Sequence, residues 1–149
     1  MRAISIGFLL ALTAVTQAQN DHKVLNSEQT ATLCTLLNHP SEYSGKTVRL
    51  QAIVASGLEF SVLRDDSCPA KENPTSGKHD VVLATFGKDV HDSKSPLNKK
   101  LTNLLKKNHQ AEITTVGTFT DPGDYIGHQL CCRYEFSIQR LISVTDVRK

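Results

Sequence analysis

Apolar and polar side chains alternate strictly along residues 47–56, and this two-residue period limits the fold more than any other feature. One side of the segment carries its apolar residues: Val48, Leu50, Ala52 and Val54. The other side carries Arg49 and Gln51. Successive side chains of a β-strand point to opposite faces, so the pattern predicts a strand with one buried face and one solvated face.

A second alternating segment follows directly and predicts a β-hairpin. Gly57-Leu58 provides the turn signal, and alternation resumes in residues 59–65, where Phe60 and Val62 are expected to face the core. After a loop that contains prolines and a glycine, residues 81–86 form a third short apolar strand.

Two further strands are predicted near the C-terminus, at residues 111–120 and 134–147. Gly117 lies inside the first of them, and an interior glycine suggests a bulge or a sharp bend in a barrel. The inward side chains of the last strand are expected to be Phe136, Ile138, Ile142 and Val144.

Helical signals occur in two places. Ser27 is expected to cap a helix that runs to about Leu37, before Pro40 stops it. Ser95-Pro96 starts the second helix, because proline is favoured in the first turn. Its apolar side chains recur at helical spacing: Leu97, Leu101, Leu104 and Leu105.

The predicted order is therefore a helix, three strands, a second helix and two strands. This is the layout of an OB-type barrel, a partly open five-stranded Greek-key barrel. We expect a mainly β fold with helices: a five-stranded OB-type barrel with an N-terminal helix and a helix between strands three and four.

Residues 33–69 and 117–147 also resemble a group of small secreted bacterial proteins with an OB-like core. The second stretch carries the Gly127-His128 pair and the closing strand. The resemblance implies the fold and an exported location, and it implies no biochemical activity.

The first 18 residues have the layout of a secretory signal. Arg2 is followed by an apolar run at residues 4–15 and by small residues before Gln19. The run is shorter than the roughly 20 residues that span a bilayer, and a lipoprotein signal would have cysteine in place of Gln19. We expect a cleaved signal at 1–18, a polar leader at 19–26 and one OB-like domain at 27–149, in a periplasmic or secreted protein without a membrane anchor.

Export makes disulfides the expected state of the four cysteines. In an OB barrel the first strand starts, and the second ends, at the same end, so Cys34 and Cys68 are expected to pair. The rival is a bond from Cys68 to Cys131 or Cys132, which is disfavoured because these two are expected at the opposite end. An adjacent pair would close a tiny, strained ring, so Cys131 and Cys132 are not expected to bond to each other.

His128, Cys131 and Cys132 form the only cluster that suggests a metal- or thiol-linked function. Their spacing matches no standard zinc site and is not a CxxC motif, so this remains a weak alternative, and no cofactor is expected. The pairs His79-Asp80 and His91-Asp92 have no nucleophile in a recognisable setting. No catalytic residue is assigned, and the protein is not expected to be an enzyme.

Single-stranded nucleic acid is a second alternative, because OB barrels often bind it with a basic groove and exposed aromatic rings. The chain has no Trp and a formal net charge of only +2. The helix lysines fit a solvated helix face: Lys99, Lys100, Lys106 and Lys107. Nucleic acid is therefore disfavoured as a partner.

The sequence favours an exported, non-enzymatic binding or accessory module whose partner is an unknown small molecule or protein. OB folds commonly bind ligands on the face of strands two and three and through the loops after strands one and four. The weak candidates in those loops are Gly57, Leu58, Tyr125, Gly127 and His128. These side chains could equally serve only to pack the loops.

Overall fold

The structure is a computed structural model that describes residues 28–57, 59–68, 81–90, 95–127 and 131–147. The expected signal peptide and leader lie outside these residues, as do Leu58, His128 and the His-Asp pairs. Among the described helices, none is long and apolar enough to cross a membrane.

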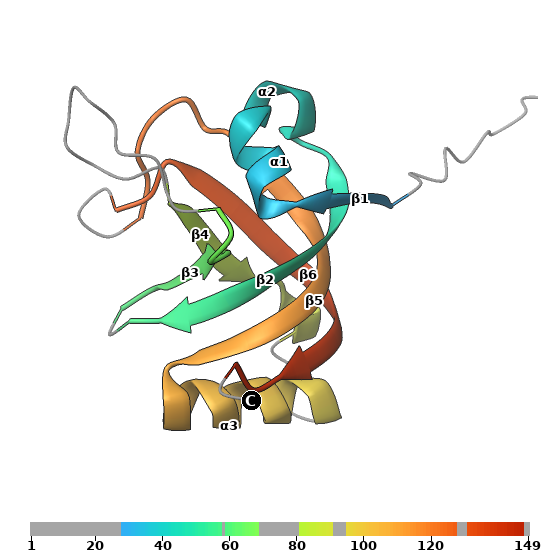
Figure 1. The fold of residues 1–149 in the computed structure, drawn as a ribbon, viewed down its shortest axis with the longest axis vertical. Coiled ribbons are helices and arrows are strands. Elements are labelled where there is room, and N and C mark those ends of the chain that lie inside the picture. Colours follow the sequence, from blue (N-terminus) through green and yellow to red (C-terminus); the bar gives the residue numbers. More distant parts are fainter. Residues whose placement is uncertain (1–27, 58, 69–80, 91–94, 128–130, 148–149) are drawn as a thin grey trace, which may run out of the picture.

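The chain forms a closed barrel with short helices at both ends (Figure 1). Its strands are β1 (Gln29–Thr32), β2 (Thr47–Ser56), β3 (Ser61–Arg64), β4 (Val82–Phe86), β5 (Gln110–Thr120) and β6 (Tyr134–Thr145). The helices are α1 (Leu33–Asn38), α2 (Pro40–Tyr43), the 3-10 turn η1 (Lys88–Val90) and α3 (Pro96–Asn108).

The strand order confirms the OB-type barrel. β2, β3 and β4 form an antiparallel meander, β4 pairs in parallel with β6, and β6 pairs antiparallel with β5. The antiparallel pairing of β5 with β2 closes the barrel. β2 to β6 are thus the five barrel strands, and β1 is an additional strand on β2.

The interior is filled by the inward residues of all five barrel strands. The predicted inward side of β2 is buried as expected, and the largest fully buried side chains are Phe119 and Phe136. α3 crosses one end of the barrel, where Leu101 is buried (Figure 1). α1 and α2 cover the other end, where Leu33, Leu36 and Tyr43 are buried.

Gly117 lies directly against β6 at a shift in the β5–β6 register, which confirms the predicted bulge. A side-chain carbon there would overlap the Ser137 carbonyl and the Phe136 ring. The β5–β6 register shifts just before Gly117 and again after Thr114. The shift changes which β6 residues face inward, so Leu141 packs against the core and Ile142 is only half-buried.

The prediction of one helix across residues 27–37 was wrong in its first half. Residues 29–32 are a strand, and the helix begins at Leu33 with Thr32 as its N-cap. The Thr32 hydroxyl accepts a hydrogen bond from the Thr35 N–H at 3.1 Å. The strand forms because residues 29–32 pair in parallel with β2 and bury Ala31, a tertiary contact that outweighs local helix propensity. Pro40 ends α1 as predicted and also begins α2.

The expected orientation of β3 was also wrong. Leu63 is the fully buried residue, Val62 is half-buried, and Phe60 is 37% exposed. The reversal at residues 57–60 is longer than a two-residue turn, and the Gly57 N–H donates to the Phe60 carbonyl across it. Phe60 therefore lies outside the ladder, while Leu63 pairs with Val54 over the core.

Both cysteine pairs are disulfide-bonded. Cys34 is bonded to Cys68, as predicted. Cys131 is bonded to Cys132, which corrects the expectation that these neighbours would not pair with each other. The expectation that Cys131 and Cys132 lie at the opposite end of the barrel from Cys68 was wrong as well. Tyr134 at the start of β6 pairs with Val82, and Val82 pairs with Leu63 near the end of β3. The start of β6 and the end of β3 therefore lie at the same end of the barrel.

Candidate functional site

β1 and β3 share one edge of β2, and their C-terminal ends meet there. β1 runs parallel to β2 and ends with Thr32 opposite Gln51. β3 runs antiparallel and ends with Arg64 opposite Ile53. Only Ala52 lies between the β2 residues that pair with β1 and those that pair with β3. Neither strand has room to continue along β2, so the chain turns away from β2 after each of them.

The Cys34–Cys68 disulfide joins the two segments that turn away. Cys34 lies in the first turn of α1, directly after β1. Cys68 closes a tight turn after β3, where its N–H donates to the Asp65 carbonyl. The cross-link sets the separation of these segments, with the Cα atoms 5.4 Å apart.

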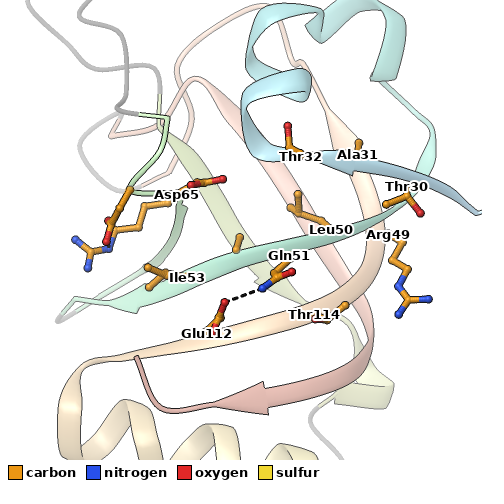
Figure 2. A pocket seen from close by; sticks show the side chains of 13 residues that line it. Thr30, Ala31, Thr32, Arg49, Leu50, Gln51, Ile53, Asp65, Glu112 and Thr114 are labelled. Carbon is orange, nitrogen blue, oxygen red and sulfur yellow. Dashed lines mark hydrogen bonds and ion pairs between the residues drawn. The ribbon is translucent and has the colours of Figure 1, made fainter. Parts of the chain in front are cut away.

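A groove of about 630 Å³ lies over this junction on the outside of the barrel, and we call it the β1–β3 groove. Figure 2 shows β1 along one side, β2 across the floor and β5 beyond it. The outward polar side of β2 supplies the floor, which ends at the half-buried Ile53. The other side chains that contribute come from β1, β5 and the end of β3: Thr30, Thr32, Arg64, Asp65, Asp66, Glu112 and Thr114.

Hydrogen bonds hold the carboxylate in the middle of the groove. Gln51 Nε2 donates to Glu112 Oε1 at 2.7 Å (Figure 2). The hydroxyl of Thr145 donates to the other Glu112 oxygen at 3.1 Å. Glu112 and Gln51 are therefore oriented by β5, β2 and β6 together.

Hydrogen bonds and an ion pair also hold the side chains at the end of the groove near β3. The Asp65 carboxylate accepts hydrogen bonds from the Ser67 N–H at 2.9 Å and the Ser67 hydroxyl at 2.6 Å. Arg64 donates to Gln110 Oε1 at 2.8 Å and lies 3.9 Å from an Asp66 oxygen. These bonds hold the turn that ends at Cys68.

Charge is divided along the groove. Arg49 stands at one end beside Thr30, and Asp65 stands at the other (Figure 2). Within the part of the chain that the structure describes, no residue pairs with the Arg49 guanidinium. Near β3 the cation Arg64 is outnumbered by Asp65 and Asp66, and Glu112 adds a third carboxylate in the middle of the groove. The groove is thus positive at one end and negative at the other.

Of the loop residues singled out from the sequence, the structure describes Gly57, Tyr125 and Gly127. Gly57 follows β2 at the end of the barrel where the Ser56 N–H donates to the His109 carbonyl. Tyr125 and Gly127 follow β5, whose C-terminal end pairs with the start of β2 at Thr47. Since β2 and β5 are antiparallel, the two loops start from opposite ends of the barrel, while a side-chain carbon on Gly127 would lie 3.7 Å from the Leu83 side chain of β4.

The surroundings of Cys131 and Cys132 differ from those of a thiolate ligand pair. Cys132 is fully buried, and its backbone exchanges hydrogen bonds with Ile126. A side-chain carbon on Gly127, whose φ is +78°, would lie 2.9 Å from the Cys131 sulfur. The disulfide engages both sulfurs, and the described residues contain no group of three possible metal ligands.

The β1–β3 groove could not be found from the sequence, because β1 was not predicted. The signal that was present is the polar side of β2, where Arg49 and Gln51 were placed on the solvated face. The lysines of α3 are exposed on its outer side, as predicted for a solvated helix face.

No protein-family model matches the chain, and no curated protein matches it. Among solved structures, it is similar to a putative aspartyl-tRNA synthetase from Leishmania major Friedlin, with 18% identity and a TM-score of 0.46. The match covers 90% of this chain and 23% of that protein. A similarity of this size carries no argument about ligand or activity.

Proposed function

We propose that the protein is an exported, non-enzymatic binding module and that its ligand occupies the β1–β3 groove. The observation that carries the proposal is the construction of the groove. Side chains from β1, β2, β3 and β5 converge there, and a disulfide links two of its sides. Concave sites with a few oriented polar groups are where proteins most often bind small ligands.

Preorganisation supports this assignment. Gln51 and Glu112 are held by hydrogen bonds on rigid strands, and the Asp65–Cys68 turn is held by the disulfide. A ligand therefore meets groups that are already ordered, which lowers the entropic cost of binding.

Export remains part of the proposal and is supported by the disulfides, which persist in oxidising compartments. Nucleic acid is the weaker candidate. Phe60 is exposed, but it lies outside the groove, and no aromatic side chain lines the groove among the described residues. Base stacking therefore has no platform there.

The test is a ligand screen followed by mapping of backbone amide NMR shifts on the oxidised protein. Compounds and short peptides that bind should shift the amides of Thr30, Gln51 and Thr114, and leave those of α3 unchanged. Shifts confined to the loops at residues 57–60 or 121–127 would contradict the proposal, and so would a screen without any groove ligand.

A further inference from the structure

We infer that the β1–β3 groove takes a short extended peptide with free ends, with its carboxylate at Arg49 and its ammonium group at Asp66. This inference rests on the proposed function and names the ligand class of the same site. Its basis is the division of charge along the groove and the length over which that division occurs.

The charges are arranged to receive a zwitterion. Arg49 is exposed and without a described partner, so its guanidinium is free to make a paired contact with a carboxylate. At the other end, Asp66 is exposed and only loosely paired with Arg64, at 3.9 Å. The Asp65 carboxylate already accepts a hydrogen bond from the Ser67 hydroxyl within the turn. Asp66 is therefore the carboxylate at this end that is available for an ammonium group.

The length of the groove sets the length of the peptide. Arg49 and Ile53 are four positions apart on β2, which corresponds to about 13 Å along an extended strand. Arg64, which precedes the acidic turn, lies directly opposite Ile53. An extended peptide advances about 3.3–3.6 Å per residue, so roughly four residues separate an ammonium group and a carboxylate at these two ends.

The middle of the groove suits a peptide backbone better than a ring. The hydroxyls of Thr30 and Thr114 and the amide of Gln51 can both donate and accept, as peptide N–H and C=O groups require. Ile53 offers an apolar contact for one side chain. Nucleobases stack on aromatic side chains, and none lines this groove among the described residues.

The experiment uses tetra-alanine in four forms: free, N-acetylated, C-amidated and blocked at both ends. Each is titrated into the oxidised protein, and the dissociation constant is obtained from groove amide shifts. The free peptide should bind best, and each block should weaken binding by roughly three- to tenfold, the value of one partly exposed charge-assisted contact. Di-alanine should bind more weakly than tetra-alanine, because it cannot reach both ends.

Variants assign each end of the peptide. In Arg49→Ala, C-amidation should no longer weaken binding, while N-acetylation still should. In Asp66→Asn, N-acetylation should no longer weaken binding, while C-amidation still should. Lys99→Ala, on the exposed side of α3, is the matched control and should retain both effects. A variant that cancels the effect of blocking only one end of the peptide has lost a direct contact with that end. A general loss of groove structure would instead weaken the binding of all four peptides.

The outcomes separate this inference from the proposed function. If all four peptides shift the groove amides with equal affinity, the charge assignment is overturned and the groove remains a binding site. If no peptide shifts them but another compound from the screen does, the ligand class is overturned and the proposed function stands. If nothing shifts the groove amides, both are overturned.

Discussion

Cys34 is bonded to Cys68, and this disulfide links the segment that leaves β1 to the segment that leaves β3. The two strands end head to head on the same edge of β2, with only Ala52 between their pairings. The bond therefore does more than attach α1 to the barrel. It also sets the separation of the segments beside the β1–β3 groove.

Removing this bond should lower stability substantially. The loop it closes has a sequence separation of 34 residues, so the loop-entropy model gives a loss of roughly 3–4 kcal/mol for Cys34→Ala/Cys68→Ala. Denaturant unfolding measures the effect. Cys131→Ala/Cys132→Ala is the control, and its loss should be smaller because no residue lies between the bonded cysteines. Equal losses for the two double variants would contradict this role.

Disulfide mapping tests both bonds directly. A tryptic digest without reduction should release one peptide that contains Cys131 and Cys132 as an internal disulfide, about 2 Da lighter than its reduced form, since two hydrogens are lost. The Cys34 and Cys68 peptides should appear joined to each other. A joined Cys68 and Cys131 peptide would instead restore the rival pairing and contradict the structure.

Gly117 should not tolerate a side chain. An alanine would place its carbon against the Ser137 carbonyl and the Phe136 ring, so Gly117→Ala is expected to cost about 1–3 kcal/mol of stability. At Gly57 the nearest heavy atom to such a carbon is the Phe60 carbonyl oxygen at 3.4 Å, an ordinary contact. Thermal and denaturant unfolding should therefore show little change for Gly57→Ala, and equal tolerance at both glycines would argue against the bulge.

The orientation of β3 can be tested with two substitutions. Leu63 is fully buried, so Leu63→Ala should cost about 2–5 kcal/mol. Phe60→Ala removes a larger but exposed side chain and should change stability by no more than about 0.5 kcal/mol. A larger loss at Phe60 than at Leu63 in denaturant unfolding would mean that the orientation predicted from the sequence is the correct one.

Long, regular patterns predicted the barrel well. β2 matched its predicted bounds, because a full two-residue alternation records which side of a strand is buried. α3 began at Pro96 as predicted, since proline is favoured in the first turn and the leucines that follow keep the helical period. The Cys34–Cys68 bond followed from the same strand order.

Short segments depended on tertiary contacts that local patterns do not carry. β1 is four residues long and exists because β2 offers a free edge. The orientation of β3 depends on the length of the turn at residues 57–60, and a change of one residue reverses a strand's faces. The groove was missed for the same reason, because one of its sides is β1.

A groove-filling substitution provides the most direct test of the central claim that the β1–β3 groove binds the ligand. Gln51 lies on the floor with its side chain exposed, so Gln51→Trp should occupy the groove and leave the barrel folded. Lys99→Trp places the same ring on the exposed side of α3. Titration of tetra-alanine or another ligand from the screen should give at least tenfold weaker binding to Gln51→Trp and unchanged binding to Lys99→Trp, and undiminished binding to a folded Gln51→Trp variant would contradict the claim.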